Sequence, residues 1–372
     1  MRVLHRLIFQ EVQNAMSENN FKTPQEAWAA FSAGDAKGYA VDIAAELGLT
    51  EGELVAAGIG KNVVRLDVDW GDLIKRLEEL GEVKILTRNP SVVHEKIGTF
   101  GKVSINGEMG LVLNGDVDLR LFLGRWGHGF AVETNTPRAG RRRSVQFFDH
   151  EGKAIHKIFL TDNSNETGYD ALVAEFRAEN QEPGIETLPP LPKSVTRKDE
   201  DVDVDNLRAH WRKMTDVHQF HGLLKDFNVG RQQGMRLVGT EFAERLSNDS
   251  LKTMLESASE SGLPIMVFVG NAGAIQIHTG PVKTIREMGE WINVMDPRFT
   301  LHLRMDMIAE AWIVRKPIRE GVVTTVELYD AELNNFAIFC GERAPKEAEN
   351  PEWQKLAEGL PRFDAKEHVL AE

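Results

Sequence analysis

The two halves of this chain repeat each other at a nearly constant spacing. Asn89 and Gly98 bracket a strand-like stretch, and Asn271 and Gly280 bracket its counterpart 182 residues further on. Three further pairs of segments align at offsets of 182, 181 and 180 residues: DLRL from Asp118 with TLHL from Thr300, SVQFFD from Ser144 with TVELYD from Thr325, and Ile158-Phe159 with Ile338-Phe339. A chain that repeats itself in this way builds one structural unit twice.

Each copy changes its hydrophobic period in the same order. Helical spacing dominates residues 26–60 and about 206–260, and short strand-like runs split by turn residues fill 82–160 and 264–341. We therefore predict an α+β fold: a tandem duplication of a unit with N-terminal helices followed by a large, mainly antiparallel β-sheet.

The predicted domain layout follows from this pattern. A stretch rich in Pro, Lys, Asp and Glu and poor in large apolar residues predicts an exposed linker between the copies. We expect a poorly ordered or helical extension at 1–20, the N-terminal repeat at 21–180, the linker at 181–205, the C-terminal repeat at 206–345, and a helical, polar tail at 346–372.

Composition narrows the classes of function. The net charge of −13 argues against non-specific binding to nucleic acid or anionic membranes, so an anionic ligand needs a local cluster of basic residues. With one cysteine, Cys340, the chain has no disulfide framework and no Cys-cluster metal site. No apolar run reaches membrane-spanning length and the N-terminus does not fit a secretory signal, so we expect a cytoplasmic protein without membrane insertion.

The segment AAELGLTEGEL, residues 44–54, has the helix–turn–helix pattern of DNA-binding proteins. Its second helix offers Glu51 and Glu53 where base and phosphate contacts need Arg, Lys, Asn or Gln. Carboxylates there would repel DNA. We interpret the segment as a packing hairpin of helices, and keep a DNA-binding protein as a distant alternative.

The stretch from Trp211 to Arg236 carries the strongest candidate for chemistry. His218 and His221 lie one helical turn apart, at a predicted helix start that Asp216 or Thr215 can cap, and Arg231 follows on the next predicted helix. An isolated histidine is more often a packing or surface residue than a ligand, whereas one in a first helical turn can reach a bound molecule.

Many short motifs of the sequence, in the same order, resemble those of the haemin-binding and haemin-degrading family of bacterial haem-uptake systems, the HemS/ChuS/PhuS/HmuS group. The most specific are TRN…VHE, DLRLFL, VQFFDH, MTDVHQF, IMVFVGN, FTLHL and RKP, and the resemblance covers nearly the whole chain after the first ~20 residues. It implies a cytoplasmic protein that receives imported haem b, held non-covalently, and hands it on or opens the ring.

The resemblance also implies site residues. Haem needs an axial ligand on iron, cations for its propionates and apolar walls. His218 matches the axial ligand, and Arg231 matches an arginine over the opposite haem face, where it would be the catalytic group if the protein is an enzyme. Four further positions match, two that reach the haem from the N-terminal copy and two near the propionates: Arg120 and Phe122, and Lys316 and Arg343.

Two weaker candidates and one departure accompany these residues. His221 is an alternative iron ligand, and His94, which the repeat places opposite Gln276, is a candidate for a second haem site. Where relatives can carry Gln and Tyr, this chain has Ile338 and Cys340, which puts a polar network for oxygen chemistry in doubt.

Two functions remain open from the resemblance. As a carrier, the protein would take haem from an inner-membrane importer and pass it to a separate oxygenase. As an oxygenase, it would need electrons from an external reductase, because no flavin or nicotinamide motif occurs in the sequence. The carrier depends little on the changes at Ile338 and Cys340, and the oxygenase depends on them strongly.

Overall fold

The structure is a computed structural model that describes residues 19–364 except 68, 138–139, 191, 193–194 and 345. The predictions for the first residues and for the end of the tail therefore lie outside the described residues. The chain forms two compact units. Of the described residues, unit 1 comprises those in 19–85, 99–110 and 121–190, and unit 2 comprises those in 86–98, 111–120 and 192–364.

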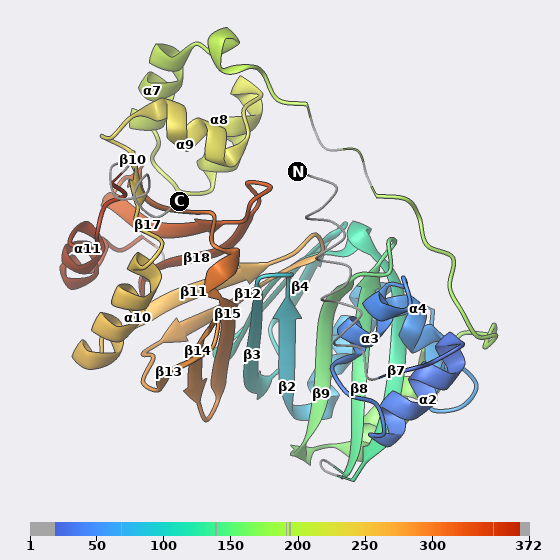
Figure 1. Cartoon of the computed structure of the whole chain (residues 1–372). Helices are drawn as coiled ribbons and strands as arrows, with labels where there is room; N and C mark the ends of the chain where they lie inside the picture. Colours follow the sequence, from blue (N-terminus) through green and yellow to red (C-terminus); the bar gives the residue numbers. More distant parts are fainter. Residues whose placement is uncertain are drawn as a thin grey trace. The chain divides into compact units, whose positions relative to one another are not determined.

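Unit 1 combines a helical layer with an antiparallel sheet (Figure 1). Its strands follow the order β1-β7-β8-β9-β2. Its elements are α2 Pro24–Ala33, α3 Ala40–Glu46, α4 Glu51–Ala56, β1 Val63–Leu66, α5 Trp70–Arg76, β2 Gly81–Arg88, β4 Val103–Asn106, β7 Trp126–Thr136, β8 Gly140–Asp149, β9 Ala154–Ser164 and α6 Glu166–Glu175.

The helices α2, α3 and α4 cover the sheet through a shared apolar core. Trp28 and Ile43 pack there with Phe130 of β7 and Phe148 of β8. A capping box starts α4, since the Thr50 backbone N–H donates to the Glu53 carboxylate at 2.8 Å. Glu51, at the first position of α4, is buried. The helix–turn–helix segment thus packs on the sheet, with Glu51 buried and the Glu53 carboxylate bonded to the start of its own helix.

Unit 2 repeats this plan with more strands. Two runs of strands have the orders β10-β16-β17-β18-β11-β12-β6 and β3-β15-β14-β13. The elements are β3 Val92–Thr99, β5 Met109–Asn114, β6 Val117–Phe122, α7 Val204–Arg212, α8 Gln219–Phe227, α9 Arg231–Val238, β10 Ala243–Leu246, α10 Ser250–Ser261, β11 Ile265–Gly270, β12 Ala274–Gly280, β13 Ile285–Met288, β14 Trp291–Asp296, β15 Phe299–Arg304, β16 Glu310–Ile318, β17 Gly321–Tyr329, β18 Asn335–Gly341 and α11 Pro351–Glu358.

The helices α7, α8 and α9 gather into one cluster in Figure 1. Their apolar faces share a core with β16 and β17, in which Trp211, Phe220 and Tyr329 are buried. The Trp211 indole N–H donates to the Arg315 carbonyl of β16 at 2.9 Å, which ties α7 to the sheet. The apolar residues of α8 pack in the same core against β16 and β17: Phe220, Leu223, Leu224 and Phe227.

The predicted fold class is confirmed: each copy has helices followed by antiparallel strands. The repeats are not the compact units, however, because unit 2 includes 86–98 and 111–120 from the first copy. There β3 pairs with β15, and β6 lies beside β12.

One predicted offset is wrong by a residue. Gln146 pairs with Lys157 across β8 and β9, and Glu327 pairs with Ile338 across β17 and β18. Lys157 is therefore the counterpart of Ile338, at an offset of 181. Within the part of the chain that the structure describes, no helix is both long and apolar enough to cross a membrane.

Candidate functional site

His218 lies one residue before the start of α8, not inside its first turn, and its side chain is 90% exposed. The Asp216 carboxylate accepts hydrogen bonds from the His218 backbone N–H at 2.8 Å and from Nδ1 of its imidazole at 2.6 Å. Among the described residues, nothing is hydrogen-bonded to Nε2 of His218. A carboxylate on one ring nitrogen, with the other ring nitrogen open, is the arrangement that protein imidazoles use to bind metals.

The Asp216 carboxylate is held in its ionised form. The backbone N–H of His218 lowers the pKa of Asp216 most, followed by the His218 imidazole, and the charge of Arg343 adds to the effect. Arg343 itself donates from Nη1 to the Glu347 carbonyl at 3.0 Å. Arg343 therefore lies within electrostatic range of the carboxylate that orients His218.

Arg231 begins α9 and forms a two-bond ion pair with Glu327 of β17. Its Nε and Nη2 donate to the two carboxylate oxygens at 2.7 and 2.8 Å. The Glu327 side chain is completely buried, whereas that of Arg231 is 31% exposed. A paired fork of this kind fixes the guanidinium in one plane.

Glu327 holds a second cation. The Lys316 ammonium, 5% exposed, donates to Glu327 at 2.5 Å and to the Thr325 hydroxyl at 3.1 Å, and the Tyr329 hydroxyl donates to Glu327 at 2.8 Å. Burial alone would raise the pKa of Glu327, but the charges of Arg231 and Lys316 outweigh burial and hold the pKa well below its usual value. The carboxylate is thus ionised, and the formal charges of this group sum to +1.

Phe220 connects His218 with this cationic group. It lies two residues after His218 in α8, and its ring centroid is 4.9 Å from the Arg231 guanidinium carbon and 4.9 Å from the Lys316 ammonium. Trp211 meets the ring edge-on at 4.8 Å. The structure therefore brings Arg231 and Lys316 together at Phe220, two residues along the chain from His218, and places Arg343 within electrostatic range of Asp216.

Ile338 and Cys340 extend the same face of the sheet. In the ladder of β17 and β18, Ile338 is opposite Glu327 and Cys340 is opposite Thr325. Cys340 is buried, and burial raises the pKa of its thiol to about 12. Since iron binds the thiolate, this neutral thiol is a poor candidate for a second ligand.

Arg120 and Phe122 point to one face of β6, as their alternation predicts, and both are half-buried. The Arg120 guanidinium pairs with the Asp118 carboxylate and contacts the Leu119 carbonyl. Arg120 belongs to unit 2 and Phe122 to unit 1. The described contacts of Arg120 do not include His218 or Glu327, so the roles assigned to this pair stay predictions.

The two remaining histidine candidates differ in exposure. His221 is exposed on α8. His94 is fully buried on β3, where the Gln276 side-chain amide approaches its Nδ1 at 2.7 Å and donates to its carbonyl at 3.2 Å. The repeat correctly places these two residues opposite each other. A ligand could reach His94 only if these packed strands opened.

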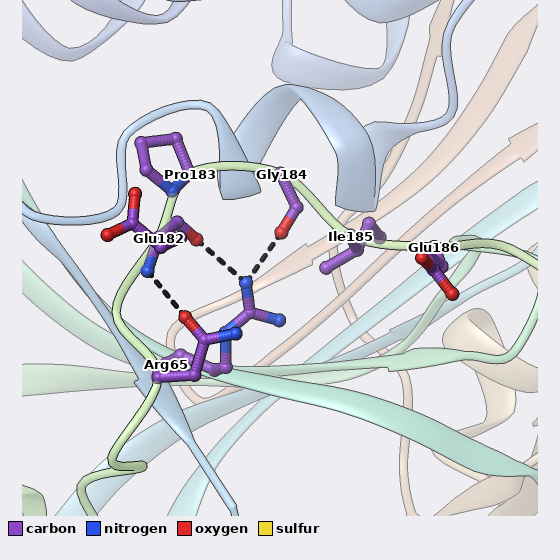
Figure 2. Close-up of a pocket in the computed structure, with 7 residues that line it drawn as sticks. Arg65, Glu182, Pro183, Gly184, Ile185 and Glu186 are labelled. Carbon is purple, nitrogen blue, oxygen red and sulfur yellow. Dashed lines mark hydrogen bonds between the residues drawn. The ribbon is translucent and has the colours of Figure 1, made fainter.

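Unit 1 contains a separate cavity of about 340 Å³ beside Arg65 (Figure 2). Nη2 of Arg65 donates to the carbonyls of Glu182 and Gly184 at 2.9 and 2.6 Å. The Gln181 side-chain oxygen accepts from the Arg65 backbone N–H, and its amide donates to the Arg65 carbonyl. Residues 181–184 are thus hydrogen-bonded along the edge of β1. With its guanidinium engaged and with Glu182 and Glu186 in the wall, the cavity does not suit an anionic porphyrin.

Sequence reasoning missed Glu327, around which the site is built. A charge within the strand-like run VVTTVELY, residues 322–329, was the available signal, because a buried carboxylate needs a cation. Among the described residues, no cluster of three or more His, Cys, Asp or Glu side chains could hold a metal ion. A metal at His218 would therefore need most of its ligands from a bound molecule.

The fold and this site define a duplicated α+β ligand-binding protein, with an exposed, carboxylate-oriented imidazole beside a cationic group of net charge +1. The chain belongs to the family of the haemin-degrading HemS.ChuX domain, which matches residues 48–176 and 228–360. The two matched segments fall one in each copy of the repeat.

Relatives from several bacteria cover most of the chain. It is 42% identical over 320 residues to the hemin transport protein HmuS of Yersinia pestis, covering 85% of this chain and 91% of HmuS. The crystal structure of holo-PhuS, a heme-binding protein from Pseudomonas aeruginosa, has a TM-score of 0.88 at 43% identity and covers 92% of this chain and all of that one. ChuS, an E. coli heme oxygenase, has a TM-score of 0.81 at 40% identity, over 91% of this chain and 99% of that one.

Proposed function

We propose that this protein binds haem through His218 and carries it within a bacterial haem-uptake system. The supporting observation is the His218 imidazole, exposed, with Nδ1 held by Asp216 and Nε2 open. The HmuS, PhuS and ChuS relatives, named for hemin transport, heme binding and heme oxygenase activity, support the choice of ligand.

The residues present fit haem. When bound, haem supplies an iron that takes an axial nitrogen and a ring edge with two carboxylates. His218 would bind the iron, Arg231 would lie over the opposite haem face, and Lys316 and Arg343 would balance the carboxylates. Phe220 supplies an aromatic surface beside both cations. The proposal also assigns haem contacts to Arg120 and Phe122, the role of alternative iron ligand to His221, and a second haem site to His94.

The carrier is the first choice between the two mechanisms. The strand positions beside Glu327 are apolar in this chain, Ile338 and the neutral thiol of Cys340, which favours holding haem over organising oxygen chemistry. A cytoplasmic location, an importer upstream and an oxygenase downstream follow from this choice. Degradation with an external reductase is the second candidate, supported by ChuS, the heme oxygenase relative.

Titration of haemin into the purified apo-protein tests the binding step. We expect a defined Soret band at one haem per chain, shifted or lost in His218→Ala and retained in the control His210→Ala, an exposed histidine on the neighbouring helix α7. An unchanged spectrum in His218→Ala would refute the assignment of the ligand.

A second assay separates carrier from enzyme. Holo-protein is mixed with oxygen and a reductase, with and without catalase. A carrier keeps its spectrum when catalase is present. Conversion to a linear tetrapyrrole that persists with catalase would instead identify the protein as a haem-degrading enzyme.

A further inference from the structure

Haem binding alone does not explain why Glu327 is buried together with two cations. Burying a carboxylate with two cations costs desolvation free energy, and apolar side chains of similar size would serve stability as well or better. Glu327 has no exposed surface, and Lys316 is 5% exposed. The fold therefore has no evident need for three charges at this place.

Unit 1 provides an internal comparison at the equivalent positions. The helix α4 starts 180 residues before α9, and in both helices the residue before the first helical position donates its N–H to the side chain three residues on: Thr50 to Glu53 and Gly230 to Gln233. Glu51 is thus the counterpart of Arg231.

The strands give the remaining counterparts. The registers of β7 with β8 and of β16 with β17 make Gln146 the counterpart of Glu327 and Thr134 the counterpart of Lys316. The first copy therefore has none of the three charges of the second. Its Glu51 instead pairs with Lys157, the counterpart of Ile338.

The strand position that Glu327 occupies in unit 2 is uncharged in unit 1. The same strand position folds with an uncharged Gln146, so the strand itself does not require Glu327. Of these two equivalent places, the one in unit 2, where the exposed imidazole lies, has two cations on one fully buried carboxylate. The polarity is reversed between the copies: the helix supplies the cation in unit 2 and the anion in unit 1.

We infer that Glu327 is a positioning residue for ligand binding, which clamps the Arg231 guanidinium and the Lys316 ammonium over Phe220 as a fixed cationic pair for an anionic group of the bound porphyrin. This inference rests on the proposed function. Glu327 is buried and both of its oxygens are engaged, so it acts through Arg231 and Lys316 without touching the ligand.

Two variants separate the effect of the negative charge of Glu327 from the effect of its side-chain length. Glu327→Gln keeps the size and removes the charge, and Glu327→Asp keeps the charge and withdraws the carboxylate by one methylene. If Glu327 positions the cations, both weaken haemin binding by about tenfold or more, because each breaks the two-bond clamp. If only the net charge mattered, Glu327→Gln would tighten binding and Glu327→Asp would leave it unchanged.

A double-mutant cycle tests whether Glu327 acts through Arg231. We expect Glu327→Gln to weaken binding in the wild-type background and to weaken it by a smaller factor in Arg231→Ala, where only the contact with Lys316 remains to be lost. The matched control is Tyr329→Phe, which removes a hydrogen bond to Glu327 but neither cation, with binding expected within about twofold of wild type. Unfolding midpoints of the apo-proteins show which variants fold. If Glu327→Gln does not fold, haemin binding by Glu327→Asp tests the inference.

Iron-free protoporphyrin IX identifies the anion. Weakening with both haemin and the iron-free porphyrin assigns a ring carboxylate, and weakening with haemin alone assigns an anion on the iron. Wild-type binding with unchanged affinities in both Glu327 variants, or tighter binding in either, would overturn the inference while leaving the proposed function intact. Wild-type protein that binds no haemin would overturn both.

Discussion

Asn89 and Asn271, 182 residues apart, hold each other's turns in unit 2. The side-chain amide of Asn89 donates to the Gly270 carbonyl, and that of Asn271 donates to the Arg88 carbonyl, both at 2.9 Å. Each side-chain oxygen accepts backbone N–H groups of its own turn. The repeat in the sequence is therefore also a reciprocal contact, made by equivalent residues of the two copies.

Replacing Asn89 tests how much this contact stabilises unit 2. Asn89 also donates to the Phe336 carbonyl at 2.9 Å, so Asn89→Ala leaves two carbonyls and two backbone N–H groups without these partners. We expect the free energy of unfolding in urea to fall by about 2–3 kcal/mol. Asn163→Ala, which removes an exposed bond to Glu82, should change it by less than about 0.5 kcal/mol. Equal effects would show that the reciprocal turns add nothing.

The same pair shows which features of the fold could be predicted from the sequence alone. Its offset predicted the duplication, and apolar alternation predicted the strands around it. Offsets cannot say which copy's strand pairs with which, so the pairing of β3 with β15 in unit 2 could not be predicted. That pairing is decided by tertiary packing, because both copies have similar apolar faces.

The site divides in the same way. His218 was recognisable from its place before a helix and from resemblance, and so was Arg231. Glu327 was not, because its partners Lys316 and Arg231 lie 11 and 96 residues away. Lys316 meets it across the paired strands β16 and β17, and Arg231 meets it only when α9 packs on the sheet. Asp216 was identified only as a possible cap, and its contact with the imidazole depends on the turn before α8.

Asp216 should tune the ligand strength of His218. Asp216→Asn keeps an oxygen for the His218 backbone N–H but removes the charge that polarises Nδ1. We expect haemin affinity, measured by absorbance titration, to fall about tenfold. Asp226→Asn removes an exposed carboxylate elsewhere on α8 and is the matched control. Equal affinities for wild type and Asp216→Asn would mean that the carboxylate does not act on the ligand.

His278 predicts acid sensitivity of unit 2. Its ring stacks on Phe299 at 3.7 Å, and burial, with the charge of Lys96 as a second cause, lowers the pKa of His278 to about 3. The ordinary pKa of a histidine is about 6.5. Between pH 6.5 and about pH 3, His278 is therefore protonated in the unfolded chain and neutral in the folded chain. As the pH is lowered through that window, the free energy of unfolding should decrease, by up to about 1.4 kcal/mol per pH unit from this residue.

Urea unfolding between pH 7 and pH 4 measures this slope. His278→Leu should flatten it relative to wild type, whatever its effect on stability at pH 7. The control His210→Leu changes an exposed histidine and should leave the slope as it is. A His278→Leu slope identical to that of wild type would show that His278 does not contribute to the acid sensitivity.

The buried pair of Glu51 and Lys157 should matter to unit 1 more than any surface ion pair. The two side chains are 6% and 10% exposed, and the ammonium also lies 5.7 Å from the Phe148 ring centroid. Lys157→Met leaves the Glu51 carboxylate buried without its cation, which should lower the free energy of unfolding by about 3–5 kcal/mol. Adding Glu51→Gln should recover much of the loss, because the uncompensated charge is then gone. Lys153→Met, which breaks an exposed pair with Glu151, should cost less than about 1 kcal/mol. If the double variant is as unstable as Lys157→Met, lost packing rather than charge is the cause.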